Sequence, residues 1–323
     1  MDFQTFKLNY LNRSEIHSGP ISTSSIGNLS AKAAFSDHMK IFQELTKFKI
    51  TALVSFTTGL GYILAASEIT FTLFYAIAGI FLLAAASSSL NHWQEKDTDA
   101  LMDRTRLRPI PSGRIEPNSA LWLSIGLLAS GMLLLIMTTN LTTTAVGLIT
   151  FAWYNGVYTP LKRKSAFAII PGALVGALPP VAGWAAAGGD VFAGGILMTA
   201  VYFFIWQIPH FWLLLMLYGK DYEKGGFPTL NKIFSPEQLK RITFVWLVGN
   251  VITAMLLPLF LQINYNISFY LLAAISVWMM YVSVKFLLKA SGRIEIRNTF
   301  IAINFYTLLL ITILSIDKLI KVF

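Results

Sequence analysis

The chain alternates between long apolar stretches and short polar segments over most of its length. Nine of the stretches are long enough to cross a bilayer, because a membrane-spanning helix needs about 20 mostly apolar residues. They cover roughly residues 48–66, 69–90, 119–138, 141–159, 166–187, 195–217, 242–262, 267–288 and 298–316. The pattern therefore predicts an all-α, polytopic membrane protein with nine transmembrane helices.

The fifth stretch, 166–187, is the least regular of the nine. Pro171, Pro179 and Pro180 interrupt it, and several glycines thin its apolar surface. Proline removes a backbone donor, so in a membrane the freed carbonyl groups need neighbouring helices or a cavity to satisfy them. We therefore expect this helix to lie against such partners.

The composition agrees with a membrane protein. Hydrophobic residues make up 55% of the chain and charged residues only 13%, with a mean hydropathy of +0.62, whereas soluble proteins carry about a quarter charged residues. The chain has no cysteine, which excludes disulfides, thiolate metal sites and cysteine nucleophiles.

The placement of the basic residues predicts the orientation in the membrane. If the N-terminus is cytoplasmic, all but two of the 25 basic residues fall in cytoplasmic segments. The two exceptions are Lys318 and Lys321. Lysine and arginine favour cytoplasmic segments. The pattern thus predicts a cytoplasmic N-terminus and an outer C-terminus, in a bacterial cytoplasmic (inner) membrane. It also assigns the net charge of +9 to topology rather than to nucleic-acid binding.

Residues 1–41 differ from the rest of the chain. They include a polar, serine-rich stretch and no apolar core long enough for a secretory signal. We expect a flexible cytoplasmic tail over residues 1–41, followed by a transmembrane domain over residues 42–323.

The most unusual polar segment, residues 91–109, follows the second apolar stretch directly. On a continuing helix, residues four apart advance by about 40° around the axis, so one stripe carries Asn91, Glu95, Asp99 and Asp103. Such oxygen ligands suit a hard cation, and Mg²⁺ typically combines one or two carboxylates with phosphate oxygens of a substrate. The stripe therefore predicts a metal site.

Basic residues directly downstream offer donors to phosphate oxygens: Arg104, Arg106 and Arg108. With the stripe, they indicate a site for a metal-bound diphosphate. The alternative is a charge cluster beside the membrane that sets topology and solvates a loop. That alternative explains the basic residues but not the oxygen ligands at a strict four-residue interval.

A second polar segment follows the fourth stretch on the same side of the membrane. Tyr158 and Lys162 lie on either side of Pro160, and Arg163 and Lys164 come next. Alone, these residues are ordinary cytoplasmic positive charge. Beside the acidic stripe, they form a possible second set of diphosphate donors.

The sixth stretch contains polar residues that are costly inside a membrane. His210 either serves a site or bonds a neighbouring helix. Asp221, at the cytoplasmic edge, is either a second metal ligand or half of a loop ion pair. Glycines and a proline over residues 225–228 predict a loop of the kind that caps a site.

These motifs together resemble the UbiA-type intramembrane prenyltransferases, in the branch that farnesylates heme. The resemblance rests on residues 91–109, 44–47, 176–184 and 206–212, the last followed by Lys220, Asp221 and Tyr222. It covers about residues 42–316. The first motif by itself indicates only the superfamily, and the combination is much more specific.

The resemblance implies a bundle of nine helices with cap loops on the cytoplasmic side and a central cavity open laterally to lipid. It implies that four residues hold Mg²⁺ on farnesyl diphosphate: Asn91, Glu95, Asp99 and Asp221. It also implies contacts with phosphate oxygens for Arg104, Arg108, Lys162 and Lys220. The position of Tyr158 beside these cations adds it to the candidate substrate contacts, and His210 is a candidate for the heme side.

The implied reaction transfers a farnesyl group to a vinyl group of heme b, with water completing a hydroxyethylfarnesyl substituent. Metal and basic residues stabilise the leaving diphosphate, so no nucleophilic side chain is needed. The product, heme O, would serve heme–copper oxidases, with other heme A or oxidase biogenesis proteins as implied partners.

Two departures from the family pattern affect the metal site. Glu95 stands where aspartate is usual, which lengthens the ligand by one methylene. The second acidic motif has Asp221 and Glu223 instead of two aspartates four residues apart. The second departure leaves the number of metal ions open.

Two rival functions compete with heme farnesylation. One is a sister prenyltransferase that acts on an aromatic acid or a quinone precursor, against which the motifs at residues 176–184 and 206–212 argue. The other is a transporter or a non-catalytic assembly factor. Transporters place their polar coupling groups near the membrane midplane, whereas most polar groups here lie at one cytoplasmic rim, which favours catalysis.

Overall fold

The computed structural model describes residues 36–289 and 292–322. Two units make up the chain, Met1–Lys40 and Ile41–Phe323. In the first unit, the described residues 36–40 are helical. The predicted flexible tail falls almost wholly outside the described residues and stays a prediction.

The described residues of the second unit form helices and connecting loops. Eight spans are long and apolar enough to cross a membrane: α2 (Phe48–Ala65), α3 (Phe71–Gln94), α5 (Pro117–Thr138), α8 with α9 (Ile169–Gly172, Leu174–Ala186), α10 (Gly194–Lys224), α11 (Pro236–Phe260), α12 (Asn266–Leu288) and α13 (Arg293–Val322). Two short helices lie in the connections, α4 (Lys96–Leu101) and the 3₁₀ helix η2 (Leu230–Lys232). The predicted all-α, polytopic fold is confirmed.

The remaining predicted stretch, 141–159, is helical but not uniform. It consists of α6 (Leu141–Ala152), the π-helix η1 (Trp153–Tyr158) and α7 (Thr159–Leu161) in direct succession. Asn155 lies inside the π-helix, and its side-chain amide donates to Ser87 Oγ of α3 at 2.6 Å and to the Phe151 carbonyl at 3.1 Å. Such competition with backbone bonds favours a local change of helix type. That this segment crosses the membrane as a ninth span stays a prediction.

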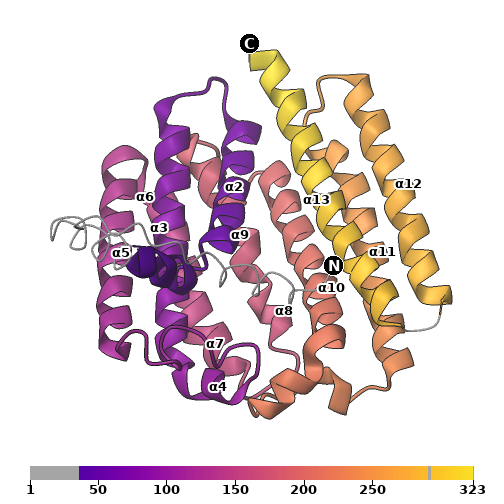
Figure 1. Cartoon of the computed structure of the whole chain (residues 1–323). Helices are drawn as coiled ribbons and strands as arrows, with labels where there is room; N and C mark the ends of the chain where they lie inside the picture. Colours follow the sequence, from indigo (N-terminus) through magenta and orange to yellow (C-terminus); the bar gives the residue numbers. More distant parts are fainter. Residues whose placement is uncertain (1–35, 290–291, 323) are drawn as a thin grey trace, which may run out of the picture. The chain divides into compact units, whose positions relative to one another are not determined.

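Helices of the second unit pack in a ring that runs from α2 through α9, α10 and α13 back to α2 (Figure 1). Helix α2 packs against α3 and α9, α9 against α6 and α10, α10 against α11 and α13, and α13 returns to α2. Two glycines let α2 and α9 approach closely. A Cβ on Gly61 would lie 1.8 Å from the Pro180 carbonyl oxygen, and one on Gly183 would lie 1.8 Å from the Thr58 carbonyl oxygen. Small residues commonly allow such contacts between membrane helices.

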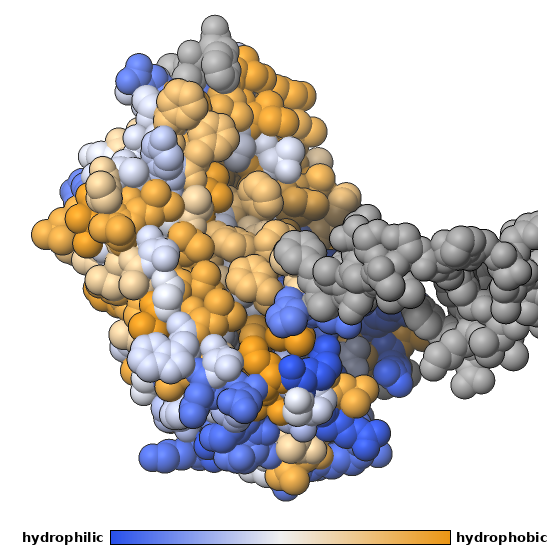
Figure 2. All heavy atoms as spheres, turned by 60° about the vertical axis from the view of Figure 1, so that its left-hand side comes forward, coloured by the Kyte–Doolittle hydropathy of each residue, from blue (hydrophilic) through white to orange (hydrophobic). Residues whose placement is uncertain are grey.

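Apolar side chains cover the middle of the face drawn in Figure 2, whereas hydrophilic residues gather toward its lower end. Large apolar side chains are exposed on several spans, among them Leu53 of α2, Met137 of α5 and Val277 of α12. Exposure of so many apolar groups fits contact with lipid rather than water. The protein is therefore an integral membrane protein.

Candidate active site

Three residues of the predicted stripe lie together at the end of α3. Asn91, Glu95 and Asp99 are each no more than 4% exposed. Although α3 ends at Gln94, the Glu95 N–H donates to the Asn91 carbonyl at 3.0 Å and the Asp99 N–H to the Glu95 carbonyl at 2.8 Å. These bonds keep a helical progression across the junction with α4, so the four-residue spacing still places the three side chains on one side.

Asp103, the fourth residue of the predicted stripe, does not belong to it. The chain leaves the helix at Met102, whose backbone is extended, so the four-residue progression ends there. Asp103 is exposed and pairs with Lys224 of α10. The expectation that it joins the stripe is wrong because the helix does not continue far enough.

Each residue of the stripe faces one basic side chain. Both Asp99 oxygens accept from Arg108 Nη1, at 2.7 and 2.9 Å, and Glu95 Oε1 lies 2.6 Å from Lys162 Nζ. The side chains of Arg108 and Lys162 are each 21% exposed. Partly exposed cations on buried carboxylates can turn toward a bound phosphate without leaving the site.

Asp221 reaches the same end of the bundle from α10. Its Oδ1 accepts from the Asp103 N–H at 2.9 Å. Its Oδ2 is buried and accepts no hydrogen bond from the described residues, and Arg104 Nε lies 3.9 Å away. A buried carboxylate oxygen without a donor is suited to a cation. Glu223, by contrast, accepts from Thr229 at 2.9 Å and braces a loop.

The remaining predicted substrate contacts are distributed unevenly. Tyr158 lies next to the stripe, with Lys162 Nζ 5.5 Å from the centre of its ring, and Arg104 lies over the ring of Tyr222. Lys220 is exposed on α10 and makes no ion pair with the described residues. The structure thus brings Tyr158 and Lys162 together and leaves Lys220 without an ion-pair partner in the described part of the chain.

His210 lies deeper along α10, eleven residues before Asp221 and so about 16 Å away along the helix axis. Its ring packs against those of Trp206 and Phe300, with both centroid distances 4.8 Å. Its Nδ1 is buried without a hydrogen-bond partner among the described residues. His210 therefore belongs to an aromatic cluster separate from the stripe.

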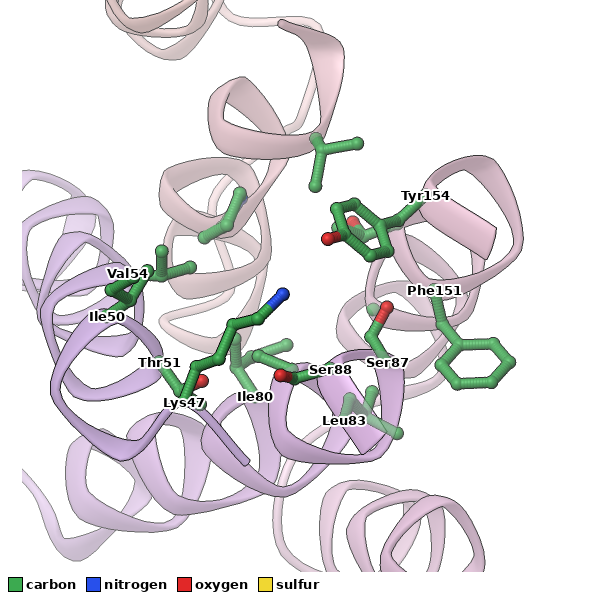
Figure 3. Close-up of a pocket in the computed structure, with 15 residues that line it drawn as sticks. Lys47, Ile50, Thr51, Val54, Ile80, Leu83, Ser87, Ser88, Phe151 and Tyr154 are labelled. Atoms are coloured by element: carbon green, nitrogen blue, oxygen red, sulfur yellow. The ribbon is translucent and has the colours of Figure 1, made fainter. Parts of the chain in front are cut away.

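An apolar cavity adjoins the stripe between α2, α3, α6, η1 and α9 (Figure 3). Its walls include Ile50, Val54, Ile80 and Leu83. Two polar groups that the sequence did not single out as site residues face each other across it, the ammonium of Lys47 and the hydroxyl of Tyr154 (Figure 3).

A signal for Lys47 existed in the sequence, since it is a cation at the start of an apolar stretch. Tyr154 had no such signal, because its direction depends on the π-helix.

Lys47 is held in an unusual conformation at the start of α2. Its φ of 45° and ψ of 48° are left-handed, which costs a non-glycine residue roughly 1–2 kcal/mol. The Ser88 hydroxyl donates to the Leu45 carbonyl at 2.8 Å and the Thr51 hydroxyl to the Thr46 carbonyl at 2.6 Å, so the turn is braced on both sides. Burial, together with the Arg108 and Lys162 cations, lowers the pKa of Lys47 to about 7.

The residues at this end suit a magnesium ion that shares its ligands with a substrate. In the described part of the chain, no three Asp, Glu, His or Cys side chains are close enough to form a metal site on their own. Mg²⁺ does not need such a set, because it usually takes one or two carboxylates and completes its shell with phosphate oxygens and water. The unbonded Asp221 Oδ2 and the carboxylates of the stripe would supply the protein's share of such a shell.

Comparison with known proteins identifies the class. The family model of the UbiA prenyltransferase family matches residues 53–309, so the chain belongs to this family and is a prenyltransferase. It is 35% identical to the protoheme IX farnesyltransferase of Oleidesulfovibrio alaskensis, over 69% of this chain and 78% of that protein. It is 31% identical to the protoheme IX farnesyltransferase of Solibacter usitatus, over 87% of this chain and 99% of that protein.

Solved structures share the fold at low sequence identity. A digeranylgeranylglyceryl phosphate synthase is 17% identical with a TM-score of 0.71, covering 87% of this chain and 98% of that chain. A UbiA homolog from Archaeoglobus fulgidus, bound to GPP and Mg²⁺, is 16% identical with a TM-score of 0.59, covering 85% of this chain and 99% of that chain. These neighbours support a UbiA-like bundle for this chain.

Proposed function

We propose that the protein transfers the farnesyl group of farnesyl diphosphate to a vinyl group of heme b. The observation that carries this proposal is the junction of a buried acidic stripe, the cations paired with it and an apolar cavity. Such a junction matches a substrate with an anionic head and a long apolar chain. The choice of heme and farnesyl rests on the relatives that are named protoheme IX farnesyltransferase.

We assign the metal ligands to the residues with suitable oxygens at this junction: Asn91, Glu95, Asp99 and Asp221. A magnesium ion bound there would neutralise charge on the leaving diphosphate. We assign the contacts with phosphate oxygens to the nearby basic residues Arg104, Arg108, Lys162 and Lys220. The aromatic ring of Tyr158 lies beneath the ammonium of Lys162 and helps to position it. The pairs of Arg108 with Asp99 and of Lys162 with Glu95 support this assignment, because they keep both cations beside the proposed ligands.

The reaction breaks the bond between the first farnesyl carbon and the diphosphate oxygen, whose electron pair stays on the oxygen. The π electrons of the heme vinyl group then form the new carbon–carbon bond. Water adds to the resulting carbocation and loses a proton, which gives the hydroxyethylfarnesyl substituent. The apolar walls of the cavity keep water from the first, allylic cation.

The heme side of the proposal centres on His210. Its flanking rings, Trp206 and Phe300, form an aromatic surface against which a flat macrocycle can stack. The buried, unbonded Nδ1 provides one polar contact. Replacing His210 with alanine should raise the Michaelis constant for heme and leave that for farnesyl diphosphate unchanged.

The decisive test is to incubate the purified protein with heme b, farnesyl diphosphate and Mg²⁺ and to analyse the porphyrins by mass spectrometry. We expect a product heavier by one farnesyl group and one hydroxyl group. Activity on an aromatic acid or a quinone precursor in place of heme would indicate the sister reaction. A protein that binds heme but modifies none of these acceptors would indicate a transporter or an assembly factor.

We further propose a bacterial inner-membrane location with the N-terminus in the cytoplasm and the C-terminus outside, and delivery of heme O to proteins of oxidase biogenesis. The near absence of basic residues from the proposed outer segments supports the orientation. In intact cells, a tag at Met1 should be protected from external protease and a tag at Phe323 should be cleaved. Equal protection of both tags would contradict the orientation and the odd number of spans.

A further inference from the structure

A polar pocket lies at the end of the bundle opposite the stripe. The connection between α2 and α3, the start of α6 and the ends of α5 and α9 form it, at the end that Figure 1 shows away from α4. Its volume is about 390 Å³, whereas a cavity for one water molecule needs only on the order of 10–15 Å³. The pocket therefore has room for a molecular group and not just for a bare ion.

The electrostatics of the pocket favour a cation. Helices α2, α5 and α9 all end here, and none of them has a basic residue in its last turn. The last carbonyl groups of a helix lack intrahelical donors and carry partial negative charge. Of the described residues that line the pocket, only Glu68 has a charged side chain, and it forms no ion pair with other described residues.

Two helix N-termini at the same pocket do not reverse this preference. Helices α3 and α6 begin here, and N-termini ordinarily favour anions. The Thr70 hydroxyl oxygen accepts from the Thr72 N–H at 3.3 Å, and Asn140 Oδ1 accepts from the Thr143 N–H at 2.8 Å. Each of these ends therefore already has a side-chain acceptor.

The hydroxyl groups of the pocket also present acceptors. The Thr138 hydroxyl donates to the Leu134 carbonyl and the Thr139 hydroxyl to the Leu135 carbonyl, both at 2.6 Å. A hydroxyl has one proton to donate, so these two groups can offer only oxygen lone pairs to a ligand. Together with the Glu68 carboxylate, they suit a group that is positively charged and rich in N–H donors.

Large apolar side chains border this polar pocket. Met137 directly precedes Thr138, Leu141 directly follows Asn140, and Phe71 begins α3; these three apolar side chains are each at least 74% exposed. In a membrane protein, such side chains contact lipid. The pocket thus combines a polar interior with an apolar rim, which fits a molecule that has a cationic head and long apolar chains.

We propose that this pocket binds the head group of a phospholipid with a primary ammonium group, such as phosphatidylethanolamine. The ammonium donates to the Glu68 carboxylate and to the hydroxyl oxygens of Thr138 and Thr139, and the phosphate accepts from the Ser67 and Thr72 hydroxyls. The acyl chains lie along the apolar rim. Phosphatidylcholine has the positive charge but no N–H donor, and phosphatidylglycerol has no positive charge.

A lipid bound here would stabilise the walls of the apolar cavity. Helices α2, α3, α6 and α9 contribute residues both to this pocket and to that cavity. A ligand that binds only the folded protein raises its stability by mass action. Phosphatidylethanolamine should therefore raise the melting midpoint, and this effect is independent of the transferase reaction.

Native mass spectrometry of the delipidated full-length protein tests the assignment. The ligands are phosphatidylethanolamine, phosphatidylcholine and phosphatidylglycerol with identical acyl chains, and phosphoethanolamine, which has the head group without the chains. Glu68→Gln removes the charge, and Thr139→Val removes one acceptor. Asp190→Asn is the matched control, because Asp190 is an exposed carboxylate in the connection between α9 and α10 that does not line the pocket.

We expect the wild type to bind phosphatidylethanolamine more tightly than the other two lipids, and phosphoethanolamine only weakly. Glu68→Gln and Thr139→Val should each weaken the binding of phosphatidylethanolamine by about fivefold, as for the loss of one exposed charged contact. Asp190→Asn should bind it like the wild type. The rise in melting midpoint on addition of phosphatidylethanolamine should be smaller in the two pocket variants than in the control.

Equal affinity for phosphatidylethanolamine and phosphatidylcholine would show that the pocket does not recognise N–H donors. Tighter binding of phosphatidylglycerol would indicate a phosphate site, and tight binding of phosphoethanolamine would indicate a soluble amine as the ligand. Equal lipid binding by Glu68→Gln and Asp190→Asn would place the lipid elsewhere. Each of these results overturns the proposal. If Thr139→Val does not fold, Glu68→Gln decides alone, because Glu68 is exposed and pairs with no described residue.

Discussion

Two aspartates, Asp99 and Asp317, are each 1% exposed, yet their surroundings differ in kind. Asp99 lies at the end of the bundle that carries α4, and its partner is the side chain of Arg108. Asp317 lies near the C-terminal end of α13, the end that Figure 1 shows away from α4. There it accepts from the backbone N–H groups of Asn264 and Tyr265 at 2.9 and 3.1 Å, and from the Asn264 amide at 2.9 Å.

The difference teaches how to distinguish a structural carboxylate from a functional one. Backbone donors cannot move without breaking the loop, so Asp317 fixes the connection between α11 and α12 and has little freedom to bind anything else. A basic side chain can turn toward a ligand, so Asp99 can exchange part of its pairing when a metal or a phosphate arrives. Burial alone does not separate the two cases, whereas the type of partner does.

The largest expected effect is that of Asp99→Asn. The substitution keeps the shape of the side chain but removes the negative charge from a proposed metal ligand and from the partner of Arg108. Removing one group that stabilises transition-state charge typically costs about 10²–10³ in turnover. We expect a loss of that size in heme farnesylation with an unchanged melting midpoint in detergent. Turnover within a few-fold of the wild type at low Mg²⁺ would place Asp99 with Asp317 as a structural residue.

Glu95 allows a finer test of the same end of the bundle. Glu95→Gln should lower turnover by about one to two decades, because it removes a charged contact worth about 1.5–3 kcal/mol. Glu95→Asp should lose much less, since a carboxylate remains. Steady-state kinetics at several Mg²⁺ concentrations measure both variants. Equal losses would mean that the length of the side chain, rather than its charge, is what the site requires.

Asp317→Asn should affect stability and not kinetics. The new amide group would direct a donor at backbone donors, and an unsatisfied buried group costs about 1–3 kcal/mol. We expect a lower melting midpoint in detergent and unchanged turnover per folded molecule. A variant with normal melting but impaired turnover would contradict the division between the two aspartates.

The smallest effect should come from Asp103→Asn. Asp103 is exposed, and its hydrogen bond with Lys224 holds its pKa below the ordinary carboxyl value. Any stability from this pair is therefore present above the ordinary carboxyl pKa and lost as the pH falls through the lowered pKa. Exposed pairs contribute little, so we expect melting curves and turnover like those of the wild type at pH 7. A loss of turnover comparable to that of Asp99→Asn would return Asp103 to the site.

The helical spans were predictable because hydropathy is a local property. Eight of the nine predicted stretches correspond to spans in the structure, and the exception, residues 141–159, contains the π-helix. Within this π-helix, the Asn155 side-chain amide donates a hydrogen bond to the hydroxyl of Ser87, which lies on another helix, α3. A pattern read along one segment contains no information about that contact.

The sequence by itself determined the membrane spans, which follow from local hydropathy, and the four-residue interval within the stripe, which follows from the period of a helix. Tertiary structure decided which residues join the stripe. Glu95 contacts Lys162 from a later helix, and Asn91 contacts Lys47, 44 positions earlier. Tertiary structure also excluded Asp103, through the end of the helix at Met102. Partners so distant in sequence meet only through helix packing, which depends on the shapes of whole helix surfaces and not on the polarity of single positions.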